Sequence, residues 1–288
     1  MSLSTSTIQT LRENIKKELA GLYPEREIDS IIEVLFRFRL DLRRHETGMR
    51  KHEILMPPDR EWFLHAINSL KDMTPVQYIT GETEFFELSL KVGPAALIPR
   101  PETEELVRWI LEYHAGDRCR ILDIGTGSGC IALALAKNLP EATVYATDVH
   151  KETLDLAEEN NRRLGLNVGF FLHDLNEERL PEGFLHLDLI VSNPPYIPLG
   201  ERESMDANVR DFEPHAALFV PDEDPLLFYR HIARLSLQSL RPGGFLYAEI
   251  HENFGVQVHQ LLEQNGFHEI EIRRDINGKD RMCKAKLG

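Results

Sequence analysis

Apolar residues recur at helical spacing in the first part of the chain. Between Ile28 and Leu42 they form the stripe Ile31, Ile32, Leu35, Phe38 and Leu42, and a second helical segment runs from Glu61 to Leu70. We therefore predict a small helical domain over residues 1–80, with the stripe in its core. The basic residues in this region favour a solvated helix face over a docking patch for a partner: Arg37, Arg39, Arg43, Arg44, Arg50 and Lys51.

The pattern changes after this domain. Residues 83–98 alternate and contain Gly93-Pro94, which predicts a β-hairpin within a linker over residues 81–99. Pro101, followed by glutamates, predicts a helix start, because proline fits the first turn and acids suit its dipole.

From Arg120 onward, apolar strand-like runs alternate with helical segments, which predicts a doubly wound, mostly parallel α/β sheet in a domain over residues 100–288. Asn277-Gly278 predicts a tight turn that joins the last two strands. The predicted strands are 120–124, 143–148, 168–174, 187–193, 243–250, 268–275 and 281–287.

A glycine-rich loop follows the first of these strands. It reads Gly125-Thr126-Gly127-Ser128-Gly129 and precedes an apolar helix from Cys130 to Leu139. Glycines let the backbone turn tightly and approach a ligand, and an acid at the end of the next strand, Asp148, is placed to accept hydrogen bonds from a ribose. The dinucleotide and phosphate-loop spacings are both missing, so the cofactor has a ribose but need not have a pyrophosphate. The alternative is a tight strand–helix turn without a ligand.

A second motif, Asn193-Pro194-Pro195-Tyr196, ends the strand at 187–193. Two prolines cannot donate to a sheet, so they end the strand in a stiff turn. The Asn193 side-chain oxygen and the Pro194 carbonyl can accept both hydrogens of an NH2 group, and Tyr196 can pack against its flat face. The motif therefore predicts a grip on a planar amide or amino group; the alternative is an ordinary proline-rich turn.

Composition limits the function classes. The chain has 288 residues and a net charge of −14, whereas duplex-DNA binding favours a strongly basic surface. The three cysteines have no paired spacing, which indicates a reducing compartment. The sequence contains no His-Glu-x-x-His pattern, so we predict no metal site. No apolar run is long enough for a bilayer, and residues 1–11 lack a signal-peptide core, so we expect a cytoplasmic protein without a membrane partner.

The glycine loop, Asp148 and the Asn193–Tyr196 turn together resemble S-adenosylmethionine-dependent methyltransferases that act on exocyclic or amide nitrogen. The stretch Ile98-Pro99-Arg100-Pro101-Glu102-Thr103-Glu104-Glu105-Leu106 is similar to protein-(glutamine-N5) methyltransferases of the release-factor-modifying type. The similarity also includes 77–81, 85–88, 209–214, 241–244 and 275–281.

This resemblance implies a seven-stranded Rossmann-like fold closed by an antiparallel final strand, with a small N-terminal helical domain that docks the substrate. It implies S-adenosyl-L-methionine as cofactor, with Asp174 at the adenine amino group and Leu175 at the adenine face. Asn193 would serve both cofactor and substrate. The implied substrate is the glutamine of the Gly-Gly-Gln motif in class 1 peptide-chain release factors. We expect a monomer that makes no direct contact with nucleic acid.

Three other functions remain open at this stage. A close paralogue would methylate a ribosomal-protein glutamine with the same pocket chemistry. A DNA adenine N6-methyltransferase also uses such a turn, but it flips a base and usually carries a basic recognition region, which this acidic chain does not suggest. The last alternative is a cofactor-binding scaffold without turnover. No histidine or carboxylate is predicted as a base, because a methylated amide nitrogen that still holds its proton loses it to water.

Overall fold

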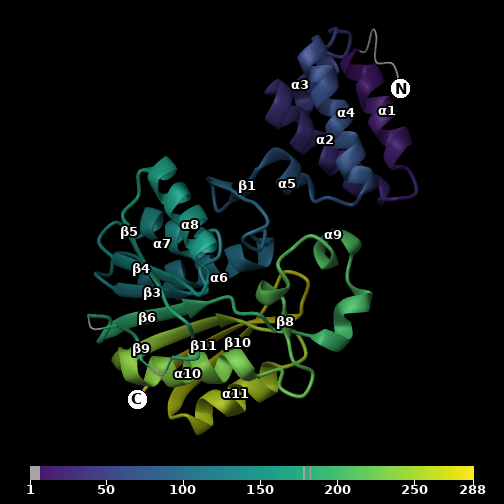
Figure 1. Cartoon of the computed structure of the whole chain (residues 1–288). Coiled ribbons are helices and arrows are strands. Elements are labelled where there is room, and N and C mark those ends of the chain that lie inside the picture. Colours follow the sequence, from purple (N-terminus) through teal and green to yellow (C-terminus); the bar gives the residue numbers. More distant parts are fainter. Residues whose placement is uncertain (1–6, 178, 182) are drawn as a thin grey trace. The chain divides into compact units, whose positions relative to one another are not determined.

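The chain folds into two compact units. The computed structural model describes residues 7–177, 179–181 and 183–288 (Figure 1). Unit 1 contains the residues up to Gly81 together with Asp206–Phe212, and unit 2 contains Glu82–Met205 and Glu213–Gly288. This division differs from the predicted boundaries in two ways. The segment 206–212 groups with the N-terminal helices, and the hairpin after Gly81 belongs to unit 2.

Unit 1 is a small helical bundle. Its core is a cluster of buried aliphatic and aromatic side chains, among them Phe36 and Phe63, whose rings meet edge to face with centroids 5.6 Å apart. The Thr7 hydroxyl caps the first helix by accepting from the Thr10 amide. The helices are α1 (Ile8–Leu19), α2 (Glu25–Leu40), α3 (Arg44–Met49), α4 (Pro57–Lys71), α5 (Val76–Thr80) and α9 (Ala207–Arg210).

The predicted apolar stripe of α2 needs one correction. Phe36 takes the buried position four residues after Ile32, whereas Phe38 is 39% exposed and lies against the Trp62 ring. The chain leaves the helix at Asp41, which has a left-handed backbone with φ of 51°, so Leu42 is buried from outside the helix. The prediction continued from Leu35 by three residues to Phe38, which lies at the edge of the apolar face, and omitted Phe36 at its centre.

The basic residues of unit 1 have acidic neighbours. Arg39 contacts Asp59 at 2.8 Å, and Arg44 contacts Glu33 at 3.2 Å. Arg50 makes two 2.7 Å hydrogen bonds to Glu53. These pairs neutralise much of the positive charge that the sequence concentrates here.

Unit 2 is built on a twisted sheet. Within the described residues the sheet has seven strands in the order β10-β11-β9-β6-β3-β4-β5. β11 alone runs in the direction opposite to the other strands of this sheet, which confirms the expected doubly wound sheet with an antiparallel final strand. The strands are β3 (Arg120–Ile124), β4 (Thr143–Asp148), β5 (Val168–Leu172), β6 (Leu187–Ser192), β9 (Leu240–Glu249), β10 (Phe267–Arg274) and β11 (Asp280–Leu287).

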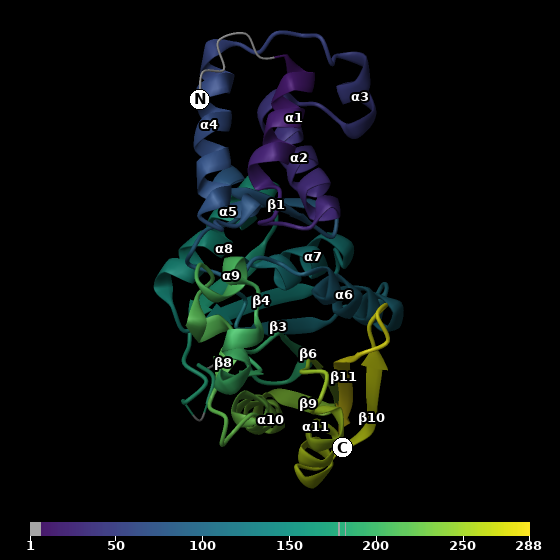
Figure 2. The same ribbon diagram turned by 90° about the vertical axis from the view of Figure 1, so that its right-hand side faces the viewer.

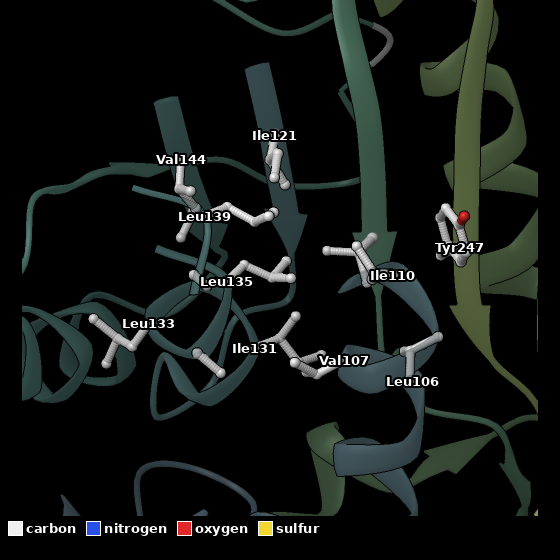
Figure 3. Close-up of a cluster of buried hydrophobic side chains, with 14 of the residues drawn as sticks. Leu106, Val107, Ile110, Ile121, Ile131, Leu133, Leu135, Leu139, Val144 and Tyr247 are labelled. Atoms are coloured by element: carbon white, nitrogen blue, oxygen red, sulfur yellow. The ribbon is translucent and has the colours of Figure 1, made fainter. Parts of the chain in front are cut away.

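Helices cover both faces of this sheet (Figures 1 and 2). One face packs against α6 (Pro101–His114), α7 (Cys130–Asn138) and α8 (Lys151–Leu164), and the other against α10 (Leu227–Ser239) and α11 (Gly255–Gln264). Figure 3 shows part of the first of these cores, where Val107 of α6 lies beside Ile131 of α7, and Leu135 of α7 lies between Ile131 and Ile121 of β3. Buried apolar area of this kind supplies most of the stabilisation of the sheet.

The two predicted hairpins form with different dimensions. The first consists of β1 (Glu82–Phe85) and β2 (Leu88–Lys91), and the remainder of 83–98 is not strand. The second joins β10 and β11 through residues 275–279, where Asp275 Oδ1 accepts from the amides of Asn277 and Lys279. The predicted tight turn is present, since the Gly278 amide donates to the Asp275 carbonyl at 2.9 Å and Gly278 has a φ of 80°. The Asp275 carboxylate reinforces this turn.

Short elements complete unit 2 between β6 and α10. They are β7 (Ile197–Pro198), β8 (Phe219–Val220), and the 3₁₀ turns η1 (Leu199–Ser204) and η2 (His215–Ala217). Across the described ranges, none of the helices combines the length and apolarity needed to span a bilayer.

Gly129 provides a test of the contact between α7 and α8. Its φ is 84°, and a Cβ atom there would lie 3.0 Å from Leu133 Cδ1 and 3.2 Å from Ala157 Cβ. We expect Gly129→Ala to lower the free energy of unfolding by about 2–4 kcal/mol, from left-handed strain plus overpacking. The matched control is Gly165→Ala, where φ is 64° with open space around the added methyl, so only strain of about 1–2 kcal/mol is expected. Equal losses in urea denaturation would contradict the packing argument.

Candidate active site

A pocket of about 340 Å³ lies at the carboxyl ends of the parallel strands, where β3 and β6 mark the switch in strand order. It is lined by residues at or after the ends of β3, β4, β5 and β6 and by three further parts of unit 2, namely residues 95–103, residues 214–217 and Phe228 of α10. Predicted residues in the lining are Gly125, Thr126, Gly127, Ser128, Asp148, Asp174, Leu175, Asn193, Pro194 and Pro195. Gly129 and Tyr196 are not among the described residues that line it.

The glycine turn is held by the end of β4. The amides of Gly125 and Thr126 both donate to the Thr147 carbonyl at 2.9 Å, and the Gly127 amide donates to Asp148 Oδ2 at 3.1 Å. Left-handed φ values of 70° at Gly125 and 58° at Gly127 make this path possible. Since these amides already have protein acceptors, the turn presents a close backbone surface, which fits a ligand without a pyrophosphate.

Asp148 is half-buried at the rim of the pocket. Its Oδ1 accepts from the His150 amide and its Oδ2 from Gly127. A carboxylate oxygen can accept two hydrogen bonds, so one further acceptor position remains on each oxygen. These positions suit a pair of vicinal hydroxyl groups.

Asp174 and Leu175 lie at the end of β5. The backbone amide and the side-chain amide of Asn176 both donate to Asp174 Oδ1, each at 2.9 Å. Leu175 is half-buried and packs against the buried cluster to which α10 contributes. The pocket therefore combines a carboxylate and an apolar side chain at this place.

The Asn193–Tyr196 turn leaves β6 between buried neighbours. Asn193 Nδ2 donates to Thr103 Oγ1 at 3.2 Å, and the Tyr196 hydroxyl donates to Glu249 Oε1 at 2.8 Å. Ser192 ties the strand end to the Ile124 carbonyl at 2.7 Å. The role of the Tyr196 ring against a bound amide stays a prediction, because its hydroxyl is directed to Glu249.

Two of the segments that carry the family resemblance, residues 98–106 and 209–214, meet beside the pocket. Glu213 is buried, and its carboxylate accepts from the Ile98 amide at 3.1 Å and from Arg100 at 2.6 Å. Asn160 of α8 bonds both Lys91 and the Ser128 carbonyl, so the chain before α6 is fastened to the glycine turn. Hydrogen bonds from side chains with low exposure thus connect the segments that form the walls of the pocket.

Several buried ionisable groups surround the site. Burial raises the pKa of Asp123 to about 7, although the Thr126 hydroxyl and the Ala132 amide donate to its Oδ2. Burial likewise raises the pKa of the Glu249 carboxyl, while hydrogen bonds from Thr103 and Tyr196 act in the opposite direction. Burial and the Glu249 charge keep the pKa of Tyr196 well above its usual range, so Tyr196 is a neutral donor.

The sequence analysis missed Asp123, Thr103 and Glu249 as members of the site. Asp123 and Glu249 each carry a carboxylate inside an apolar strand run that ends at the pocket edge of the sheet. That pattern is a usable signal, because a charge in a buried strand needs a partner or a function. Thr103 was noted only as part of the 98–106 stretch, and sequence alone does not place its hydroxyl beside Asn193.

The lining fits S-adenosylmethionine. Asp148 and Asp174 bring negative charge to a pocket whose lining is mostly apolar, which suits a ligand with a cationic sulfonium, a ribose and a flat base. The Ser128 hydroxyl is buried without a hydrogen-bond partner in the described residues, as expected beside a polar ligand. The close backbone of the glycine turn leaves room for such a molecule.

Comparison with known proteins agrees with this interpretation. A model of the PrmC N-terminal domain matches residues 10–81, and a model of the methyltransferase small domain matches residues 103–211. A methyltransferase structure from Pyrococcus furiosus is similar over 81% of this chain and all of that chain, with a TM-score of 0.53 and 18% identity, which shows the fold alone. Fold and site together define an S-adenosylmethionine-dependent methyltransferase.

Two relatives narrow the class. The release factor glutamine methyltransferase of Bacteroides thetaiotaomicron is 42% identical over 271 residues, which cover 94% of this chain and 97% of that protein. The protein of the same name from Flavobacterium psychrophilum is 39% identical, with 97% and 99% coverage. The chain belongs to the family of release factor glutamine methyltransferases.

Asp123 provides a test of the buried charge at this site. An unfolded Asp ionises near pH 3.9, whereas the folded pKa is about 7. Between these values the native state binds more protons than the unfolded state, so stability falls as pH rises through this window. Asn cannot ionise. We therefore expect the melting temperature of Asp123→Asn, relative to wild type, to increase between pH 5 and pH 8; a constant difference would contradict the raised pKa.

Proposed function

We propose that this protein transfers the methyl group of S-adenosylmethionine to the side-chain amide nitrogen of the Gly-Gly-Gln glutamine in class 1 peptide-chain release factors. The observation that carries the proposal is the Asn193–Tyr196 turn at the pocket, in a chain 42% identical to a release factor glutamine methyltransferase over nearly its whole length. The enzyme acts as a monomer on a protein substrate and makes no direct contact with nucleic acid.

The cofactor is held by the ends of β3, β4 and β5. Asp148 accepts hydrogen bonds from the ribose hydroxyls, the turn Gly125–Ser128 provides a close backbone surface, and Asp174 with Leu175 receives the adenine. S-adenosylmethionine, when bound, supplies an electrophilic methyl group on a cationic sulfur. These assignments follow the order of the pocket-lining segments along the sheet.

The substrate amide is held by the turn after β6. An amide nitrogen is a weak nucleophile because its lone pair is delocalised into the carbonyl. Asn193 Oδ1 and the Pro194 carbonyl accept the two N–H hydrogens, which fixes the nitrogen and stabilises the positive charge that develops there. No basic side chain is needed, because the methylated nitrogen loses its proton readily to water.

Two substitutions separate the methyl-acceptor grip from cofactor binding. We expect Asn193→Ala to lower turnover roughly 10²–10³-fold, because one preorganised hydrogen-bonding group is removed. Its affinity for S-adenosylmethionine should change little. Asp148→Ala should instead act mainly on the cofactor and weaken its binding by about 1.5–3 kcal/mol, as for a lost hydrogen bond to a charged group.

Single-turnover methyl transfer, calorimetry with the cofactor and thermal unfolding on the same preparations measure these effects. Release factor, ribosomal proteins and duplex DNA are tested in parallel as methyl acceptors. Wild-type transfer by a stably folded Asn193→Ala protein would refute the amide grip. Preferred labelling of ribosomal protein or DNA would refute the substrate assignment.

Unit 1 is proposed to dock the release factor. It carries exposed apolar side chains close together in the sequence at Met49, Ile54 and Met56, which are 74%, 69% and 66% exposed. A triple serine variant should raise KM for release factor and leave the affinity for S-adenosylmethionine unchanged, because the cofactor site lies within unit 2. The matched control replaces two similarly exposed residues of unit 2, Val256 and Ile276, with serine. Equal KM values for the two variants would refute docking through these side chains.

A further inference from the structure

One buried carboxylate holds both ends of the Asn193–Tyr196 turn. Glu249, the last residue of β9, is 1% exposed. Its Oε1 accepts from the Tyr196 hydroxyl at 2.8 Å, and its Oε2 accepts from the Thr103 hydroxyl at 2.7 Å. Thr103, in the first turn of α6, is 2% exposed and accepts from Asn193 Nδ2 at 3.2 Å. Three elements of unit 2 therefore meet at this carboxylate.

The chemistry of these groups fixes which partner donates and which accepts in the hydrogen bonds that link Glu249, Thr103 and Asn193. In its ionised form, which Thr103 and Tyr196 stabilise by donating to it, the Glu249 carboxylate only accepts, so the single hydroxyl hydrogen of Thr103 is committed to Glu249. Thr103 can then offer only lone pairs to Asn193, and of the two ends of the Asn193 amide only the NH2 group can donate to them. The amide oxygen is thereby left for the pocket, which Asn193 lines.

We propose that Thr103 and Glu249 are positioning residues that orient the Asn193 amide with its oxygen toward the substrate. This inference rests on the proposed function. A flipped Asn193 would present its NH2 group to the substrate NH2 group, so two donors would face each other and the amide would not be held. The unrestrained side chain would sample both orientations, since the two ends of an amide have nearly the same shape.

The position of Glu249 argues against a role in packing alone. A buried carboxylate is expensive to desolvate, and apolar residues of similar volume usually stabilise a core at least as well. Arg281 of β11 and Glu102 of α6 also act on this group, the first lowering its pKa and the second raising it. Directional control of Thr103 and Tyr196 is a property that an apolar side chain would not provide.

The test uses substitutions of Thr103 in the full-length enzyme with purified release factor and S-adenosylmethionine. Thr103→Val keeps the shape and removes the hydroxyl, and we expect it to lower kcat about 10–100-fold, by analogy with the loss of hydrogen bonds that orient metal ligands. KM for release factor and Kd for the cofactor should change little, because the lost interaction acts on the reacting amide. Thr103→Ser restores the hydroxyl and should recover most of kcat.

A double-mutant cycle shows whether Thr103 acts through Asn193. In the Asn193→Ala background, Thr103→Val should cause no further loss of kcat, because there is no amide left to orient. Glu249→Gln gives a second test: the new amide can donate to Thr103 and release its hydroxyl hydrogen toward Asn193, so kcat should fall as in Thr103→Val. Cofactor calorimetry and thermal unfolding confirm that each variant is folded.

The outcomes separate this inference from the proposed function. Wild-type kcat in Asn193→Ala would overturn the amide grip itself. Slow Asn193→Ala with wild-type kcat in Thr103→Val would overturn only the positioning role. Losses that multiply in the double variant, or a Thr103→Ser enzyme as slow as Thr103→Val, would also overturn it, since the hydroxyl would then act independently of Asn193 or not at all.

Discussion

Parallel pairing of β3, β4, β5 and β6 is the constraint on which the site depends. Parallel strands bring all their carboxyl ends to one edge of the sheet, so residues far apart in sequence, such as Gly125, Asp148 and Asn193, line one pocket. The helices that return the chain to the opposite edge bury the faces of the sheet and hold the strand ends in place. Cofactor and substrate groups can then be supplied by separate strand ends on one rigid frame.

The sequence predicted those parts of the site that follow from local chemistry. The glycine turn, Asp148 and the proline turn each come directly after an apolar run, and strand ends are where ligands bind in such sheets. The strand boundaries were also close, because parallel strands buried on both faces are nearly continuous apolar runs. Phe38 was misplaced because a stripe read at i+3 steps drifts from the centre of a helical face.

The remainder of the site depends on tertiary contacts that no local pattern encodes. Thr103 and Asn193 are 90 positions apart, and Arg100 and Glu213 are 113 positions apart, yet each pair is hydrogen-bonded. Buried carboxylates such as Asp123 and Glu249 interrupt apolar strands, which indicates that they matter without indicating what they contact. Glu249 meets Thr103 only once helix α6 is folded onto the sheet, whereas Asp123 accepts from Thr126 only three positions along the chain.

Unit 1 is formed by two separate stretches of the chain, and this has a consequence for the order of folding during synthesis. Helices α1 to α5 lie before Gly81, but the segment Asp206–Phe212, which contains α9 and groups with them, is translated only after residues 82–205. The N-terminal bundle can begin to form early, because its core belongs to one continuous stretch of chain. Its final contacts must wait until β3 through β6 have left the ribosome, so completion of the first unit is coupled to the growth of the second.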